Sequence, residues 1–333
     1  MAIMTNGVQR VIIAVKDLDK AVDIFRTLLG GQWHDLGVVH CGPSRAAWGV
    51  DVGIELISPI DDESPMAKRM RAMKCNAPGY PGGQGLLGIF FNVASLEKAD
   101  AKVGALGLHG HRVSIPAPDS PKWDDPTSRL FTMPGIRQAM RAYGQTLYEE
   151  FSYRPEDCFG VMLGIGMFDS PIGPGVHRVV VLVRNENLDK LRHLYEELLG
   201  GRWYDQGIVD EGTARALWNF DAGLEVVAPL GPGHLADVME QYGEGLLAVF
   251  FNVDDLEAAA SRAKAVGLKE ARRISIPGCQ SPDWTDPASP FGKLPTLKKA
   301  VQDSKITRYD QIVFLPHPAI GMGFGICRFE MLA

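Results

Sequence analysis

Two short apolar runs in this chain begin with an arginine that follows a side chain able to ligate a metal. The first begins at Gln9-Arg10 and the second at His177-Arg178. Four other short runs, GIEL, GMFD, GLEV and RFEM, contain the carboxylates Glu55, Asp169, Glu225 and Glu330. Imidazole and carboxylates together can hold a divalent metal ion. Arginine with carboxylates instead forms a buried ion-paired cluster.

These groups recur because the chain is a tandem duplication. Aligned without gaps, residues 21–60 and 191–230 are identical at 16 of 40 positions. Such self-similarity is the sign of a repeated structural unit. The shared residues include two tryptophans, an aspartate, an arginine and a glutamate: Trp33/Trp203, Trp48/Trp218, Asp35/Asp205, Arg45/Arg215 and Glu55/Glu225.

The first unit has the pattern of one strand, one helix and three further strands. Residues 8–15 are apolar and β-branched, as in a buried strand. Asp17 is a suitable N-cap for an amphipathic helix, which Gly30-Gly31 ends. The three strands that follow are expected at about 33–40, 44–50 and 53–58.

The same order occurs four times, which predicts an α+β fold of four tandem βαβββ units. The units are expected at about 7–60, 85–169, 175–230 and 245–333. They form two homologous halves, 1–170 and 175–333, joined by the linker-like SPIGPG. Each half is predicted to be a curved half-open barrel with helices outside. Between the first two units, the Met/Arg-rich helix MAKRMRAMK is expected to be solvated.

Composition limits the class of protein. The 333 residues are 46% hydrophobic and 22% charged, with net charge −6. With no basic cluster, nucleic acid and anionic membrane surfaces are not expected partners. The amino terminus lacks the pattern of a secretory signal, and no apolar run is long enough to span a bilayer. The five cysteines are scattered without CxxC spacing, which favours a reducing, cytoplasmic location.

The repeated pattern resembles the vicinal oxygen chelate superfamily, which includes glyoxalases, bleomycin-resistance proteins and extradiol dioxygenases. The resemblance rests on a strand that closes in V-x-D-L-x-x-A, a helix that ends in L-L-G-G, and the later strand G-I-E-L. It covers nearly the whole chain. Four units in one chain are most similar to the extradiol or hydroxyphenylpyruvate dioxygenase layout, in which a metal lies inside the half-barrel.

The resemblance implies a His or Gln on each unit's first strand and a Glu on its last. The last-strand positions match Glu55, Asp169, Glu225 and Glu330. The first-strand positions instead hold Arg10, Gly88, Arg178 and Ala248. Glycine and alanine have no donor atom, and a protonated arginine repels a divalent cation. We therefore expect Arg10 to face Glu55 and Asp169, and Arg178 to face Glu225 and Glu330, with no metal in the first half.

A β-bulge would change the second half. His177 precedes Arg178, and regular alternation turns the two side chains to opposite faces of the strand. A bulge would shift the register and add His177 to Glu225 and Glu330, a set similar to glyoxalase metal sites.

Three functions remain open. The first is an enzyme of the superfamily (a lyase, an isomerase or a ring-cleaving dioxygenase) acting on a hydrophobic, oxygen-bearing small molecule. The second is a metal-free protein that sequesters such a ligand, as in bleomycin resistance, and the third is a degenerate paralogue. The candidate site residues are Arg178, Glu225, Glu330 and His177, all in the second half. The expected cofactor is either none or one divalent metal ion held by the last three, and a homodimer is possible.

Overall fold

The structure is a computed structural model of the chain. It describes residues 4–39, 44–72, 83–168, 175–209 and 213–331. Asp169 and the expected linker at 170–174 therefore lie outside the described residues.

The first half follows the predicted order of strands and helices. Its strands are β1 (Met4–Ala14), β2 (Trp33–Val39), β3 (Ser44–Gly49), β4 (Ile54–Pro59), β5 (Gly85–Val93), β6 (His111–Ile115), β7 (Tyr148–Tyr153) and β8 (Met162–Phe168). Its α-helices are α1 (Leu18–Leu29), α2 (Pro65–Ala72), α3 (Leu96–Ala105) and α4 (Pro134–Ala142).

The second half repeats this order. Its strands are β9 (Val176–Leu182), β10 (Trp203–Val209), β11 (Ala214–Asn219), β12 (Leu224–Pro229), β13 (Gly245–Asn252), β14 (Glu270–Ile276), β15 (Ile306–Phe314) and β16 (Phe324–Met331). Its α-helices are α5 (Leu188–Leu199), α6 (His234–Tyr242), α7 (Leu256–Ala265) and α8 (Pro295–Asp303).

The long helices begin and end at the residues that the sequence indicates. The Asp17 side chain accepts a hydrogen bond from the Lys20 backbone N–H at the start of α1. At its end, Gly30 adopts a φ of 76°, and Gly200 adopts 68° at the end of α5. Few residues other than glycine adopt such angles at low cost, so the Gly-Gly pairs stop both helices.

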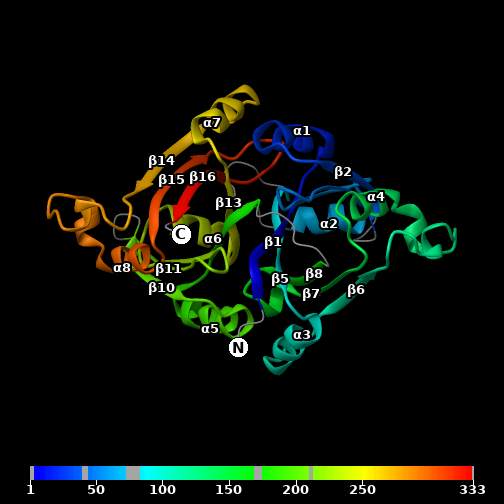
Figure 1. Cartoon of the computed structure of the whole chain (residues 1–333), viewed down its shortest axis with the longest axis horizontal. Helices are drawn as coiled ribbons and strands as arrows, with labels where there is room; N and C mark the ends of the chain where they lie inside the picture. The colour runs from blue at the N-terminus through cyan, green and yellow to red at the C-terminus, as the bar shows by residue number, and fades with distance from the viewer. Residues whose placement is uncertain (1–3, 40–43, 73–82, 169–174, 210–212, 332–333) are drawn as a thin grey trace.

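Each half is one eight-stranded sheet. The strand orders are β2-β3-β4-β1-β5-β8-β7-β6 and β10-β11-β12-β9-β13-β16-β15-β14. The first strands of paired units, β1 with β5 and β9 with β13, lie antiparallel at the centre. Figure 1 shows the two curled sheets side by side, with α1 near α7 and α3 near α5 on their outer sides. The predicted α+β fold of two half-barrels is confirmed.

Separate apolar cores fill the inner and outer faces of the sheets. The outer core joins both halves and includes Phe25 of α1 and Tyr195 of α5. Each concave face has its own core, covered by α2 and α4 in the first half and by α6 and α8 in the second.

The prediction of a solvated helix at MAKRMRAMK is wrong for α2. Met66 and Met70 are 3% and 2% exposed and belong to the concave core of the first half. The two residues are four positions apart, so they lie on one face of the helix. The charged residues mask this apolar stripe in the composition of the segment.

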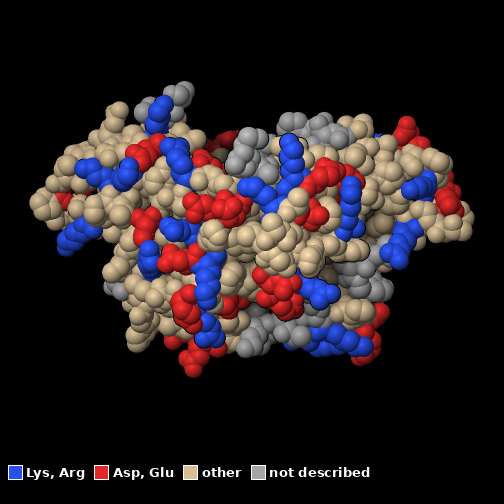
Figure 2. Space-filling view, turned by 90° about the horizontal axis from the view of Figure 1, so that it is seen from below, with Lys and Arg blue, Asp and Glu red and all other residues tan. Residues whose placement is uncertain are grey.

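The surface carries no large field of one sign on the face that Figure 2 shows. Basic and acidic side chains alternate across it. Among the described residues, no helix is long and apolar enough to cross a membrane.

Candidate functional site

A β-bulge lies at the start of the first strand in each half. Between β9 and β13, Arg178 is opposite Phe250 and Val176 is opposite Phe251, so His177 is an extra residue. Between β1 and β5, Gln9 is extra in the same way. A bulge interrupts the alternation of side chains, so neighbours can face the same side. The bulge considered from the sequence is therefore present.

Contacts place His177 and Arg178 on the same concave face. The His177 ring lies 5.7 Å from the ring of Tyr309, centroid to centroid. Arg178 Nη1 donates a hydrogen bond of 2.5 Å to the hydroxyl of that same tyrosine. Both side chains therefore meet at Tyr309 on β15.

Arg178 is the centre of a group that we call the C-terminal cluster: Arg178, Glu225, Tyr309 and Gln311. Its Nε lies 3.0 Å from Glu225 Oε2, and its Nη2 donates to Gln311 Oε1 at 2.9 Å. The Tyr309 hydroxyl donates to the same Gln311 oxygen at 2.7 Å. The guanidinium carbon lies 4.3 Å from the Phe250 ring centroid, within cation–π range.

The charge on Arg178 persists although its side chain is only 5% exposed. Burial lowers the pKa of the guanidinium, but Glu225 and Tyr309 raise it by more, and the net pKa is above its ordinary value. Burial raises the pKa of Tyr309 well above its ordinary value, so the hydroxyl keeps its proton. The cluster thus pairs one positive charge with one negative charge.

The first half contains the matching N-terminal cluster: Arg10, Glu55, Tyr148 and Glu150. Arg10 donates to Glu55 at 2.8 Å, to Glu150 at 2.7 Å and to the Tyr148 hydroxyl at 2.5 Å. Tyr148 also donates to Glu150. Burial and the nearby Glu150 raise the pKa of Glu55, and Arg10 only partly opposes them. One arginine here faces two carboxylates, Glu55 and Glu150; the predicted partner Asp169 lies outside the described residues.

Glu330 does not take the predicted place beside Arg178. It forms an ion pair of 2.6 Å with Arg328, and its side chain is 41% exposed. The reason lies in the strand register. In the third unit, Glu225 of β12 is opposite Val180 of β9. In the fourth unit, Phe250 of β13 corresponds to Val180 and is opposite Gly325 of β16, so Gly325 takes the place of Glu225. A Cβ at Gly325 would lie 2.4 Å from the Phe250 ring, so this position cannot carry a carboxylate.

His177 carries an unsatisfied buried nitrogen. Its Nε2 is shielded from solvent and has no hydrogen-bond partner among the residues that the structure describes. Burial and the neighbouring charge of Arg178 lower the pKa of the imidazole to about 3. The ring is therefore neutral at physiological pH, and it packs 4.8 Å from Phe329.

Beside His177 the second half has an aromatic wall, made of Tyr204, Trp218, Phe220 and Phe329. Trp218 and Phe220 lie 4.0 Å apart, Tyr204 and Phe220 5.7 Å, and Phe220 and Phe329 6.4 Å, centroid to centroid. Trp218 is buried, but the other three are only partly buried. This apolar surface is therefore reachable from outside the core.

The wall is a property of the second half. Counted along the duplicated sequences, Tyr204 and Phe220 correspond to His34 and Val50 in the first half. His34 Nε2 is also buried without a hydrogen-bond partner in the described part of the chain, and its ring lies 5.8 Å from that of Tyr143. The two concave faces have therefore diverged in polarity.

Sequence reasoning missed the partners on the third strand of the second and fourth units. Tyr148 and Glu150 of β7 match Tyr309 and Gln311 of β15. The signal was available as a tyrosine two residues before Glu or Gln in both halves. That spacing puts the pair on one face of a strand.

The residues do not fit the metal that the resemblance implies. The first-strand positions carry Arg10, Gly88, Arg178 and Ala248, and both arginines already hold the nearest glutamates. Of the two carboxylates predicted to join His177, Glu225 pairs with Arg178 and Glu330 pairs with Arg328. Across the described ranges, no group of three or more His, Cys, Asp or Glu side chains could hold a metal ion.

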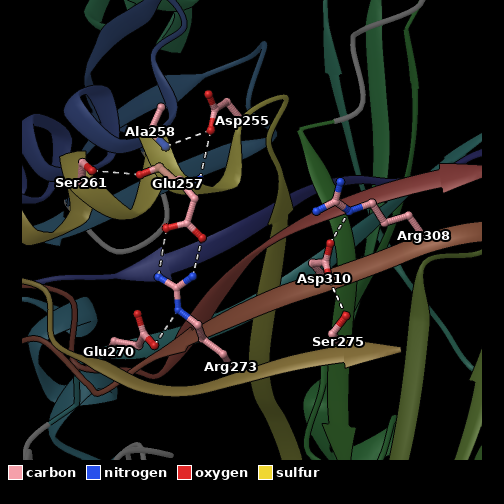
Figure 3. Close-up of polar contacts among 9 residues, drawn as sticks. All are labelled: Asp255, Glu257, Ala258, Ser261, Glu270, Arg273, Ser275, Arg308 and Asp310. Atoms are coloured by element: carbon pink, nitrogen blue, oxygen red, sulfur yellow. Dashed lines mark hydrogen bonds and ion pairs between the residues drawn. The ribbon is translucent and has the colours of Figure 1, made fainter. Parts of the chain in front are cut away.

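The outer face of the second sheet carries exposed ion pairs. Figure 3 shows Arg273 between Glu257 and Glu270, with Arg308, Asp310 and Ser275 nearby. The first half has an equivalent in Arg112, whose Nη2 lies 3.9 Å from Glu97, the counterpart of Glu257, on the outer face. Pairs repeated in both halves are explained by the fold, and exposed pairs contribute little stability.

The chain is similar to known proteins in structure and not in sequence. No protein-family profile and no curated protein match the chain in sequence. A mutant of 4-hydroxymandelate synthase from Streptomyces coelicolor has 12% identity and a TM-score of 0.61, covering 100% of this chain and 94% of that one. A Mn(II)-bound glyoxalase from Novosphingobium aromaticivorans has 11% identity and a TM-score of 0.55, covering 100% and 85%.

A third structure is a fusion of a xylose isomerase-like TIM barrel with 4-hydroxyphenylpyruvate dioxygenase. It has 13% identity and a TM-score of 0.54, and the match covers 99% of this chain but 50% of the fusion. All three neighbours are vicinal oxygen chelate proteins. The chain therefore has the fold of that superfamily, as the sequence resemblance predicted. Identities this low show the fold alone.

Proposed function

We propose that this protein binds a hydrophobic, oxygen-bearing small molecule at the concave face of its second half, without a metal ion. The observation that carries the proposal is the position of His177. Its ring contacts Tyr309 of the C-terminal cluster and Phe329 of the aromatic wall, and its Nε2 is buried without a partner among the described residues. A buried polar atom without a partner is costly, so a ligand that supplies one is stabilised.

The aromatic wall defines the apolar part of the ligand. Tyr204, Phe220 and Phe329 are partly buried and lie within one network of ring contacts. Aromatic side chains bury large areas and favour offset or edge contacts with other rings. A flat, partly aromatic molecule fits this surface better than an aliphatic or a highly charged one.

The polar groups beside the wall indicate where the ligand carries its oxygen. A neutral imidazole nitrogen can donate to a carbonyl or accept from a hydroxyl, depending on its tautomer. The Glu225 side chain is 16% exposed, so its carboxylate edge can also accept from a ligand hydroxyl. Arg178 holds that carboxylate through its Nε, 3.0 Å from Glu225 Oε2, while its Nη1 and Nη2 donate to Tyr309 and Gln311.

Binding is favoured over metal-dependent catalysis by the same geometry. A glyoxalase-like or dioxygenase-like site would need His177, Glu225 and Glu330 to converge, but Glu330 pairs with Arg328. Acid–base catalysis is also disfavoured, since an effective base has a pKa near the working pH. The pKa of His177 is about 3, and that of Tyr309 is well above its ordinary value.

The test is a binding screen on the full chain. Small aromatic ketones and phenols are titrated into the protein while tryptophan fluorescence, which includes Trp218, is recorded. Each hit is then measured with His177→Leu and Phe220→Val, the second of which installs the residue of the first half. Both variants should weaken binding by about tenfold or more, because His177→Leu removes the polar contact and Phe220→Val removes a ring of the aromatic wall.

The control variant is Arg273→Gln, on the outer face of the same sheet. It should bind as the unmodified protein does. Equal binding by all three variants, or no binding of any aromatic ketone or phenol, would contradict the proposal.

A further inference from the structure

The first half carries a polar site that the proposed function does not use. At its bulge, Gln9 Oε1 accepts a hydrogen bond of 2.7 Å from Arg10 Nη1. Gln9 is only 8% exposed, and its Nε2 is buried without a partner within the described chain. Gln9 occupies the place that His177 occupies in the second half. Both bulges thus present an unsatisfied nitrogen beside an arginine cluster.

The charge at the two bulges differs. In the second half, Arg178 and Glu225 balance each other, and Gln311 is neutral. In the first half, the residue that corresponds to Gln311 is Glu150, which is a second carboxylate on Arg10. One guanidinium then faces two carboxylates in a site where the Arg10 side chain is 5% exposed.

An excess negative charge in a buried site is costly unless a positive charge or a proton neutralises it. The side chains of Glu55 and Glu150 are 14% and 13% exposed, so an edge of each remains accessible. The rings of Phe90 and Trp48 lie beside Arg10, whose guanidinium carbon is 4.0 Å and 5.6 Å from their centroids.

We propose that the first half binds a second small molecule of a different class, a primary amine in its ammonium form attached to an aromatic or apolar body. The ammonium donates to Glu55 and Glu150 and supplies the missing positive charge. A neighbouring oxygen of the ligand accepts from Gln9 Nε2. Anionic molecules are excluded by the two carboxylates. The proposal does not depend on ligand binding in the second half.

The experiment compares three probes of nearly equal shape by calorimetric titration: benzylamine, which is protonated at neutral pH, benzyl alcohol and benzoate. At the site that depends on Glu150, benzylamine should bind most tightly and benzoate most weakly. In Glu150→Gln the affinity for benzylamine should fall by about tenfold or more, the effect of removing one partner of a buried charge pair. Benzyl alcohol should be affected much less.

Glu149→Gln is the matched control, since Glu149 precedes Glu150 on β7 but pairs with Arg112 on the outer face. It should leave benzylamine binding unchanged. Gln311→Glu provides a second test, because it gives the second half the carboxylate pair of the first. This variant should bind benzylamine at two sites instead of one. Equal affinities for the three probes, equal effects of Glu149→Gln and Glu150→Gln, or a single site in Gln311→Glu would overturn the proposal.

Discussion

Replacement of Arg178 by methionine tests whether the C-terminal cluster is an ion-paired network. Methionine keeps much of the length and apolar contact of arginine but has no charge and no donor. The change removes the ion pair to Glu225 at 3.0 Å and the hydrogen bonds to Tyr309 and Gln311. Tyr309 can still donate to Gln311, so the main loss is the counter-ion of Glu225.

The expected destabilisation is about 3–5 kcal/mol, the usual cost of removing one partner of a buried ion pair. The partial exposure of Glu225, 16%, places the value at the lower end of this range. The double variant Arg178→Met with Glu225→Gln should recover much of the loss, because no uncompensated charge remains. A double-mutant cycle on these two residues isolates their coupling.

The assay is equilibrium unfolding in urea at neutral pH, followed by far-ultraviolet circular dichroism. Arg215→Met is the control, since the Arg215 and Asp205 side chains are 33% and 41% exposed and the pair should be worth about 1 kcal/mol or less. A cost of Arg178→Met no greater than that of Arg215→Met would refute the reasoning. So would a double variant that is no more stable than Arg178→Met.

Three further predictions concern stability and its dependence on pH. Arg10→Met should destabilise the protein more than Arg178→Met in the same urea assay, because it leaves two carboxylates, Glu55 and Glu150, without a counter-ion; an equal or smaller loss would contradict this. The lowered pKa of His177 means that its contribution is present above the unfolded pKa of 6.5 and is lost as pH falls toward about 3. Between pH 8 and pH 5 the protein should lose about 2 kcal/mol relative to His177→Gln, and parallel stability curves would count against the buried neutral imidazole. The raised pKa of Glu55 has the opposite sign, so its contribution is present at acid pH and is lost as pH rises through the folded pKa. Glu55→Gln should therefore become more stable relative to the unmodified protein as pH rises from about 4 to 7; a falling relative stability would contradict this.

The fold was predictable because the signal recurs four times. Asp17, the Gly-Gly helix ends and the alternation of apolar residues each specify a local structure, and the duplication repeats them. The strands expected at 33–40, 44–50 and 53–58 are observed at 33–39, 44–49 and 54–59. The main local error was α2, where charged residues concealed Met66 and Met70.

The candidate site was predictable only in part. The pairing of Arg178 with Glu225 followed from matching positions in the repeated units. The place of Glu330 depended on the register of β16, which shifts the relevant position to Gly325. Tyr309 and Gln311 lie on a strand that contributes no family ligand, so their roles required the tertiary pairing of β15 with β16.

The face of the strand on which His177 lies could not be predicted from the sequence either. One extra residue decides whether an imidazole faces the core or the outside, and the sequence pattern is compatible with both. The structure places His177 inside without adding Glu330. A metal site would have required both changes together.

In each half an arginine, Arg10 or Arg178, stands where the resemblance implies a metal ligand. The most direct measurement is the metal content of freshly purified protein, combined with calorimetric titration of Mn²⁺, Fe²⁺ and Zn²⁺. We expect no stoichiometric metal and no metal binding that depends on His177. One equivalent of metal per chain that is lost in His177→Ala but kept in Arg178→Met would contradict it.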